Sequence, residues 1–541
     1  MRLKKDSSEQ KLKGAYYTPW QLADAMAGLF ASQDISNVLE PSCGDGVFLD
    51  SLKNLNLLDR VRKLTAVEIE GDEAEKVRGR YSGFGQVTVR TEDFFDYYGR
   101  VLGKERFDLI LGNPPYIRYQ YLKESQRKMQ SQILTSHGMK ANKLINAWVA
   151  FLVACVQLLS EKGKIAFVIP AEILQVAYAE DLRLYLADHL AKITLITFER
   201  LVFPDIEQEV IVLIGEKGEE EKGIRIVEMS TLDDFAGFKL EQNGFQKLGH
   251  VREKWTKYFV SAEEMALIQQ LRGDKRFAKF SEYGLINIGI TTGNNGYFSI
   301  TEEITEQYDL EEITLPLIGR SSHAHGIYFT PEDWESNKRA GKRARLVCFP
   351  EIPFEKYPDG HKRYIARGEI NGEHEGYKCS IRDRWYIVPS VWAPDAFFLR
   401  RNNLYPKFVL NKCRAVSTDT MHRMKFNEGV EPENVLLSYY NSISFAFTEI
   451  CGRSYGGGVL EILPGEMGNI LIPRIEQIDT GLREKLLSCI DSIVRNDEDI
   501  ETALNAVDEE VLVKVLGIDA EVCRSCRRIW KKMQKRRLGR G

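Results

Sequence analysis

The chain has 541 residues, of which 43% are hydrophobic and 28% charged, and its formal net charge at pH 7 is −4. A chain of this length predicts about two to four domains. The composition is that of an ordinary globular protein and excludes collagenous, disordered and disulfide-scaffold classes.

Alternating strand and helix patterns fill the first 216 residues. Short apolar runs predict strands at 38–39, 64–68, 87–90, 107–111, 164–169, 193–199 and 209–215. Helical spacing of apolar residues predicts helices at 22–32, 47–55, 72–81, 146–159 and 178–188, of which the one at 146–159 is expected to be amphipathic. Such alternation indicates an α/β fold with a doubly wound, mostly parallel sheet, and the last two strands are expected to form an antiparallel edge.

The pattern changes after a charged, glycine-bearing stretch at 216–223, which predicts a linker. Aromatic and β-branched runs then predict short strands, including 286–292, 384–388 and 407–410, before helical spacing returns at about 478–517. We therefore expect a first domain at 1–222, a large mixed α+β domain at 223–475 and a helical extension with a basic tail at 476–541.

Charge is unevenly distributed along the chain. Residues 1–240 carry 31 basic and 35 acidic side chains, whereas residues 336–426 carry 19 basic and 9 acidic ones. The stretch 524–540 holds nine Lys and Arg residues and no acid. The rear half therefore has basic stretches that the net charge conceals.

Cellular location follows from the N-terminus and the cysteines. The N-terminal residues lack the apolar core of a signal peptide, and no apolar run reaches the roughly 20 residues that span a bilayer. Nine cysteines, an odd number, fit reduced thiols rather than disulfides. We expect a cytoplasmic protein that does not enter a membrane.

The segment 40–46, Glu-Pro-Ser-Cys-Gly-Asp-Gly, directly follows the first predicted strand. Glycines allow a tight turn and a close approach of the backbone to a ligand. The next strand ends at Glu68, whose carboxylate can accept hydrogen bonds from both hydroxyls of a ribose. A connection between strand and helix that binds nothing is the alternative for the loop, and a solvated strand end is the alternative for Glu68.

No phosphate-binding lysine motif follows this loop, so a nucleoside without phosphates fits better than a nucleoside triphosphate. S-adenosylmethionine is a ligand of that kind. Asp93, after the third strand, can accept a hydrogen bond from its adenine amino group, and Phe94 can pack on the ring. Cys43 is interpreted as a small buried packing residue, because a direct methyl transfer needs no covalent protein intermediate.

The segment Asn113-Pro114-Pro115-Tyr116 follows the strand at 107–111. Two prolines fix the backbone and remove two N–H donors, which leaves carbonyl acceptors facing a pocket. The Asn113 side-chain oxygen and the Pro114 carbonyl can accept from both N–H bonds of an amine attached to a heteroaromatic ring, which frees its lone pair. Tyr116 can stack on the ring. A rigid turn would explain the prolines but not the Asn and Tyr beside them.

These motifs, in this order, resemble those of the γ-class DNA adenine-N6 methyltransferases of type II restriction–modification systems, which have the class I S-adenosylmethionine-dependent methyltransferase fold. The class begins with a Tyr-Thr-Pro motif, present here at 17–19, and continues with the glycine loop, the ribose acid, the Asp-Phe pair and Asn-Pro-Pro-Tyr. The resemblance covers about residues 14–216. It implies a catalytic first domain and a target-recognition domain at 223–475.

The resemblance also assigns roles to residues. It implies cofactor contacts around the methionine, the ribose and the adenine, with S-adenosylmethionine as the cofactor, from Thr18, Glu40, Ser42, Gly44, Glu68, Ile69, Asp93, Phe94, Asn113 and Pro115. The catalytic segment is Asn113, Pro114, Pro115 and Tyr116. The class has an aromatic residue on the other side of the target base in a Phe-Pro turn, which Phe203 matches; a core phenylalanine is the alternative.

Interleaved cations and aromatic residues in the second domain are expected to bind DNA phosphates and base edges. The expected contacts are Lys338, Arg339, Lys342, Arg343, Lys362, Arg363, Arg382, Arg384, Arg400 and Arg401. Asn294 and Asn295 lie in a segment similar to target-recognition parts of this class, but whether either reads adenine stays open. The tail from Arg524 is either a DNA-binding helix or a disordered basic end. Cys523 and Cys526 lack a second ligand pair, so no metal is expected.

Together these observations predict a site-specific enzyme that transfers a methyl group to N6 of a flipped adenine in double-stranded DNA. The expected form is a monomer, with a cognate restriction endonuclease as a separate protein. Similar Asn-Pro-Pro-Tyr motifs in RNA methyltransferases and protein-glutamine methyltransferases supply one alternative. A DNA-specificity subunit without catalytic activity is another, and the sequence shows no convincing nuclease motif.

Overall fold

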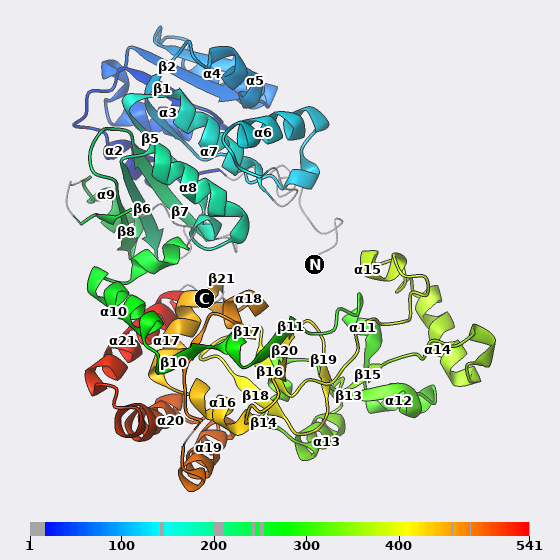
Figure 1. Ribbon diagram of the computed structural model, residues 1–541. Coiled ribbons are helices and arrows are strands. Elements are labelled where there is room, and N and C mark those ends of the chain that lie inside the picture. Colours follow the sequence, from blue (N-terminus) through cyan, green and yellow to red (C-terminus); the bar gives the residue numbers. More distant parts are fainter. Residues whose placement is uncertain are drawn as a thin grey trace. The chain divides into compact units, whose positions relative to one another are not determined.

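The computed structural model of the chain describes residues 17–140, 145–199, 209–240, 244–248, 254–455, 458–476 and 478–539 (Figure 1). The chain forms two compact units, of which the first ends at Ala262 and the second runs from Glu263 to Gly539. Within the described ranges, no helix combines the length and apolar character that crossing a bilayer requires.

A nine-stranded sheet is the framework of the first unit, in the order β3-β2-β1-β4-β5-β7-β6-β8-β9. Its strands are β1 (Asn37–Glu40), β2 (Lys63–Glu68), β3 (Val87–Thr91), β4 (Phe107–Gly112), β5 (Leu159–Pro170), β6 (Lys192–Phe198), β7 (Val210–Glu216), β8 (Gly223–Met229) and β9 (Gln246–Lys247). Strands β3, β2, β1, β4 and β5 pair in parallel, and β7 is antiparallel to both neighbours. The predicted α/β sheet with an antiparallel edge is confirmed.

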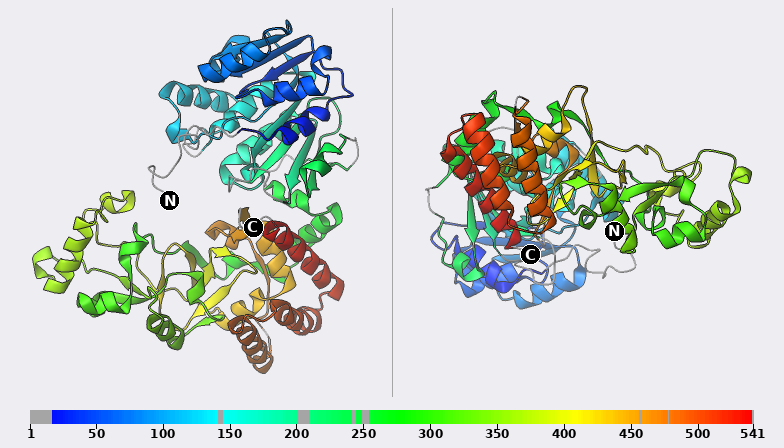
Figure 2. Two further views of the ribbon diagram at one scale, coloured as in Figure 1. Left: turned by 180° about the vertical axis from the view of Figure 1, so that it is seen from behind. Right: turned by 90° about the horizontal axis from the view of Figure 1, so that it is seen from below.

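Helices cover both faces of this sheet (Figures 1 and 2). They are α2 (Trp20–Gly28), α3 (Val47–Asn54), α4 (Gly71–Arg80), α5 (Phe94–Val101), α6 (Glu124–Ser136), α7 (Ala147–Leu158), α8 (Glu180–His189) and α9 (Leu232–Ala236). Helix α2 packs against α3 and α9, whereas α7 packs against α5, α6 and α8. Because parallel crossovers are right-handed, these two groups lie on opposite faces.

Two expectations for the first unit need correction. Helix α7 is not amphipathic: all of its residues except Gln157 are buried, because the sheet and three helices enclose it. The stretch 216–223 is not an interdomain linker either. It connects β7 to β8, and β8 pairs in parallel with β6, so the hydrogen-bonded sheet of the first unit continues beyond residue 222.

Short strands in several small sheets characterise the second unit. One sheet contains β11 (Gly284–Ile288), β20 (Met421–Phe426), β16 (Ala396–Leu399), β18 (Phe408–Asn411) and β14 (Tyr328–Phe329). A second contains β12 (Ser299–Ile300), β15 (Arg345–Val347), β13 (Thr314–Ile318) and β19 (Val416–Ser417). The remaining strands are β10 (Phe277–Lys279) with β23 (Leu471–Pro473), and β17 (Arg401–Asn402) with β22 (Val459–Glu461) and β21 (Arg453–Tyr455).

The helices of the second unit begin with α10 (Ala262–Gly273). They continue with α11 (Asn295–Phe298), α12 (Glu302–Gln307), α13 (Pro331–Arg339), α14 (Asp359–Ile370), α15 (Tyr377–Ser380), α16 (Pro432–Tyr439), α17 (Ser442–Cys451), α18 (Pro464–Met467), α19 (Thr480–Arg495), α20 (Ile500–Val507), a π-helix (Asp508–Val515) and α21 (Ala520–Leu538). The C-terminal helices belong to this compact unit, because α19 packs on α16 and α21 packs on α17.

The strand predicted at 384–388 is wrong, because these residues form turns and extended coil. Their aromatic side chains are used for packing: Tyr386 is buried in a cluster with Tyr297 and Phe349, and Trp385 packs against the same cluster. The aromatic content that predicted a strand therefore anchors a loop to the core.

Candidate active site

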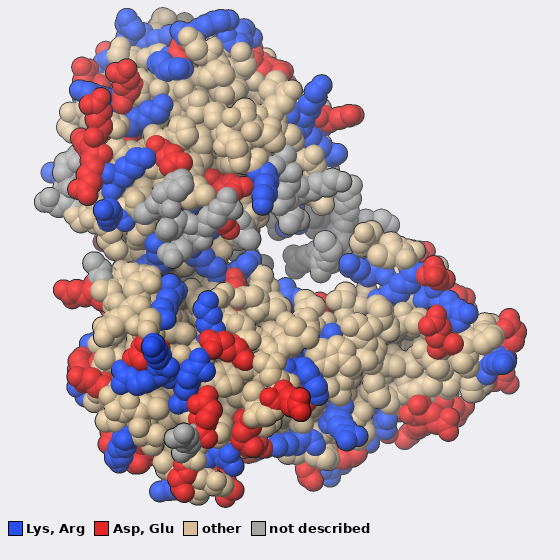
Figure 3. All heavy atoms as spheres, in the orientation of Figure 1, with Lys and Arg blue, Asp and Glu red and all other residues tan. Residues whose placement is uncertain are grey.

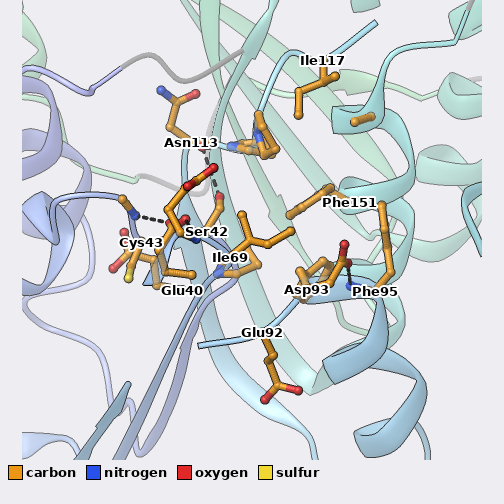
Figure 4. Close-up of a pocket in the computed structure, with 18 of the residues that line it drawn as sticks. Glu40, Ser42, Cys43, Ile69, Glu92, Asp93, Phe95, Asn113, Ile117 and Phe151 are labelled. Atoms are coloured by element: carbon orange, nitrogen blue, oxygen red, sulfur yellow. Dashed lines mark hydrogen bonds between the residues drawn. The ribbon is translucent and has the colours of Figure 1, made fainter. Parts of the chain in front are cut away.

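A cavity of about 670 Å³ opens where the parallel strands of the first unit end (Figure 4). The segments that follow β1, β2, β3 and β4 all contribute to its lining, as do the segment before α2 and the first turns of α6 and α7. The carboxyl ends of parallel strands are where open α/β sheets bind ligands. The volume is typical of a site for a ligand of cofactor size.

The glycine loop after β1 is folded against the end of β2. Gly44 and Gly46 have φ angles of +52° and +85°, which side chains rarely allow. The backbone N–H of Gly44 donates to Glu68 Oε2 at 2.8 Å, and the N–H of Glu70 donates to Glu68 Oε1 at 2.9 Å. Glu68 therefore holds the loop in place, and each of its oxygens keeps a second lone pair for a ligand hydroxyl.

Glu40 is a buried carboxyl group in the wall of the cavity, and only 2% of the residue is exposed. Its Oε2 has no hydrogen-bond partner among the described residues. Burial raises the pKa of Glu40 well above its ordinary value, and nearby Asp45 and Glu68 raise it further. A buried acceptor without a partner is costly. The positively charged amino group of a ligand would supply the hydrogen-bond partner that the Glu40 carboxyl lacks.

The segment at 113–116 joins two other predicted motifs. The Asn113 side-chain nitrogen donates to Thr18 Oγ1 at 3.2 Å, and Ser42 Oγ donates to the Asn113 carbonyl at 3.2 Å. Asn113 and Ser42 approach each other in Figure 4. Pro114 and Pro115 also line the cavity. The structure therefore brings together the three sequence motifs that contain Thr18, Ser42 and Asn113.

Tyr116 is placed differently from its neighbours. It is 9% exposed and is not among the described residues that line this cavity. Its hydroxyl donates to the carbonyl of Val168 in β5 at 3.1 Å, so the phenol is tied to the central sheet. The expected partner across the target base, Phe203, lies outside the described residues.

The far end of the cavity contains Asp93, which caps α5. Its Oδ1 accepts from the backbone N–H of Phe95 at 2.8 Å, and its Oδ2 accepts from Gln126 Nε2 at 2.7 Å. Phe94 stacks on Phe151 of α7, with ring centroids 4.7 Å apart. Gln126 and Phe151 both line the cavity, and neither was expected from the sequence.

Gln126 and Phe151 were not predicted from the sequence, for different reasons. Helix α6, which carries Gln126, was not predicted, because few of its residues are apolar. Phe151 lies in an uninterrupted apolar run, where nothing distinguishes a side chain that reaches a cavity from one in the core. The Gln126 side chain accepts from the Lys123 N–H at the start of α6, but a lysine at that position does not give the sequence pattern of a helix cap.

Ile69 and Cys43 also belong to the cavity wall. Ile69 is exposed, so its side chain offers an apolar surface to a ligand. Cys43 is buried, and burial raises the pKa of its thiol, with Glu40 and Glu68 adding to the effect. A thiol with a raised pKa is a poor nucleophile, which agrees with a packing role.

Two family models match most of the chain. Residues 54–203 match the Eco57I restriction–modification methylase model, and residues 252–512 match the C-terminal domain of the type II methyltransferase M.Eco57I. Type II methyltransferase M.AccI of Acinetobacter calcoaceticus is 23% identical over 508 residues, which cover 89% of this chain and 88% of the relative. M.HincII of Haemophilus influenzae is 28% identical over 240 residues, which cover 44% of each chain.

The chain belongs to the type II restriction–modification DNA methyltransferases. Its fold is similar to that of the type IIL restriction–modification enzyme MmeI, whose structure is a complex with DNA. That similarity has a TM-score of 0.53 and 13% sequence identity, and it covers 94% of this chain and 73% of MmeI.

The ten cations expected to bind DNA fall into two groups in this methyltransferase. The half-buried group is Lys338, Lys342, Lys362, Arg382 and Arg400, and the exposed group is Arg339, Arg343, Arg363, Arg384 and Arg401. Several of the first group are bound internally: Arg400 pairs with Glu461 at 2.9 Å, and Arg382 donates to the carbonyl of Thr291 at 2.9 Å. Basic and acidic side chains are interspersed on the face shown in Figure 3.

The two asparagines of the glycine-bearing loop in the second unit form internal hydrogen bonds. Asn294 caps α11 by accepting from the Tyr297 N–H, and it donates to Glu373. Asn295 accepts from Thr292 Oγ1 at 2.6 Å and donates to Asp419 at 2.9 Å. The side-chain amides of both asparagines therefore stabilise the conformation of this loop.

The basic tail of the methyltransferase is an ordered helix, α21, and its inner face is buried. Cys526, Ile529, Trp530 and Met533 form part of that face. Arg537, one of the nine cations of the tail, forms a buried ion pair with Glu449 at 2.9 Å. In the described ranges, no group of three or more side chains is arranged to hold a metal ion.

Proposed function

We propose that this methyltransferase transfers a methyl group from S-adenosylmethionine to N6 of an adenine that is flipped out of duplex DNA. The observation that carries the proposal is the meeting of Thr18, Ser42 and Asn113 at one cavity, beside the buried carboxyl of Glu40. Membership of the type II family supports DNA as the substrate.

The residues of the cavity fit this cofactor. Glu40 supplies a buried acceptor for an amino group, and Glu68 keeps lone pairs for the two ribose hydroxyls. Asp93, Phe94 and Ile69 supply a polar and apolar environment for the adenine. When bound, the cofactor supplies an electrophilic methyl group on a sulfonium.

Asn113 and Pro114 act on the target amine. The lone pair of an aromatic amine is delocalised into the ring, and hydrogen bonds from both N–H groups to acceptors favour the pyramidal form that can attack. The Asn113 side-chain oxygen and the Pro114 carbonyl are the proposed acceptors. An amine held in this way would accept the methyl group that the bound cofactor supplies and would release a proton to solvent. Positioning supplies most of the rate enhancement.

The exposed cations of the second unit are the proposed phosphate-binding groups, because their side chains reach solvent. Arg343 and Arg384 also donate to the backbone carbonyls of Gly296 and Ile352. Replacing Arg339, Arg343 and Arg384 together with alanine should weaken DNA binding. It should also reduce the salt dependence of the affinity, by about one unit of slope for each phosphate that is no longer neutralised. Lys514→Ala, an exposed cation outside this group, is the control. An unchanged salt dependence in the triple variant would mean that these three residues do not bind DNA phosphates.

Sequencing modified bases in DNA from cells that express the protein tests the proposal. We expect N6-methyladenine at one reproducible sequence, which an Asn113→Ala variant does not produce. Methylation of RNA or of protein glutamine, without any DNA modification, would support the alternative substrates. A cognate endonuclease is proposed as a separate protein, and its expected site is the methylated sequence.

A further inference from the structure

Gln126 lies in the first turn of α6 and has a fixed side-chain orientation. Its Oε1 accepts from the backbone N–H of Lys123 at 3.1 Å, and its Nε2 donates to Asp93 Oδ2 at 2.7 Å. A flipped amide would place an oxygen against the Asp93 carboxylate and an NH₂ group against an N–H donor. The hydrogen-bond partners therefore define which end of the amide faces the cavity.

This arrangement places Asp93 between two sets of donors. On one side its Oδ1 holds the first turn of α5 through the N–H of Phe95, and on the other its Oδ2 holds Gln126. An amide NH₂ group has two hydrogens, and Asp93 uses one of them. The second N–H of the Gln126 amide is therefore a donor that lies beside the Asp93 carboxylate, which is an acceptor. Gln126 and Asp93 both line the cavity.

We propose that Gln126 and Asp93 together recognise the adenine of the cofactor, Asp93 by accepting from its exocyclic amine and Gln126 by donating to ring nitrogen N7. The inference rests on the proposed function and deepens it. The amine of adenine is flanked by two ring nitrogens, N1 and N7. When the amine donates to Asp93, N1 faces the free N–H groups in the first turn of α5, and N7 faces Gln126.

The pair also explains why a neutral amide, rather than a second acid, occupies this position. Asp93 already accepts two hydrogen bonds, and a neighbouring carboxylate would repel it. Gln126 adds a donor without adding charge. The edge of the base is thereby matched by an acceptor and an adjacent donor, which is the pattern that adenine requires.

A thermodynamic cycle tests the N7 contact with the full chain. Calorimetry would measure the affinities of the wild type and of Gln126→Leu for S-adenosylhomocysteine and for its 7-deaza analogue, in which N7 is replaced by C–H. We expect the wild type to bind the 7-deaza analogue about five- to tenfold more weakly. Gln126→Leu should bind S-adenosylhomocysteine more weakly by a similar factor and should not distinguish the two ligands.

Gln132→Leu, on the exposed side of the same helix, is the matched control and should keep the wild-type preference. Because each variant is compared with itself on two ligands, partial misfolding does not change the ratio. If Gln126→Leu keeps the preference, or if the wild type has none, the N7 contact is overturned while the proposed function stands. If the wild type binds neither ligand, the proposed function fails as well.

Discussion

At the scale of single residues, the cavity contains groups whose energetics depend on a ligand. Glu40 is the clearest case, because its Oε2 is buried without a partner among the described residues. Asp93 is the opposite case, since both of its oxygens already accept hydrogen bonds. The sequence predicted Asp93 as a cofactor residue from its position after a strand, and Glu40 from the family resemblance. It could not show that one is unsatisfied and the other held in place, because that depends on neighbours far away in the chain.

Glu40→Gln should stabilise the ligand-free protein and weaken cofactor binding. Burial raises the pKa of Glu40, so its folded-state pKa exceeds the unfolded value of about 4.3. The stability from proton binding is present below the unfolded pKa and is lost as pH rises through the folded pKa. The gain in melting temperature should therefore be larger at about pH 8 than at about pH 5.

The same variant should bind S-adenosylhomocysteine about tenfold or more weakly, because an amide cannot ionise to pair with the positively charged amino group of the ligand. Scanning fluorimetry and calorimetry measure the two effects. Glu75→Gln, which replaces an exposed acid of α4, is expected to change neither quantity. A loss of stability in Glu40→Gln at high pH would show that the carboxyl has a partner that compensates it.

Two variants of Tyr116 can distinguish the role of its hydroxyl group from the role of its ring. Tyr116→Phe removes the hydrogen bond to Val168 but keeps the ring, so we expect a stability loss of about 1 kcal/mol and near-normal methylation. Tyr116→Ala removes the ring that the sequence predicts as a stacking surface, worth about 1–3 kcal/mol. Single-turnover methylation by the alanine variant should fall far more than its affinity for S-adenosylhomocysteine. An equal loss of both would remove Tyr116 from the catalytic role.

At the scale of elements, the periodicity of apolar residues predicted the strands of the first unit. The strands of the first unit are buried apolar runs separated by helices, and the predicted ranges lie on β1 to β7. Helices α5 and α6 were missed because one starts directly at the Asp-Phe pair and the other has few apolar residues. The apolar stripe of α21 was hidden by the cations around it. In the second unit, short strands pair with distant partners, such as β10 with β23, which periodicity cannot reveal.

The glycine loop gives a test at this scale. A Cβ at Gly46, where φ is +85°, would lie 2.7 Å from an Arg80 side-chain nitrogen and 3.0 Å from Val77 Cγ2. We expect Gly46→Ala to cost about 2 kcal/mol or more and to weaken cofactor binding, since the loop must shift. Gly28→Ala, with nothing within 4 Å of the added Cβ, should be neutral or slightly stabilising. Urea unfolding of the two variants compares them directly.

At the scale of the whole molecule, the two units differ in how they are stabilised. The first has one continuous sheet between two helical layers. The second has several small sheets, and its C-terminal helix is fixed through a buried ion pair between Arg537 and Glu449, whose side chains are each 1% exposed. Arg537 also donates to the carbonyl of Gly458 at 2.6 Å, which ties α21 to the loop before β22.

Arg537→Met should therefore destabilise the second unit by about 3–5 kcal/mol, because it leaves a buried carboxylate without its partner. Adding Glu449→Leu should recover most of the loss. Arg528→Met, at an exposed ion pair of the same helix, is expected to change stability by about 0.5 kcal/mol or less. Thermal unfolding of the three proteins measures these differences. A double variant as unstable as Arg537→Met would mean that packing around Arg537, rather than charge, determines the stability.

The second unit occupies one uninterrupted stretch of the chain, from Glu263 to Gly539. A single crossover between two related genes, near the codon for Ala262, would therefore exchange the entire unit and leave the cavity intact. If this unit selects the DNA sequence, new specificities can evolve by recombination at one joint, without any change in the chemistry of methyl transfer.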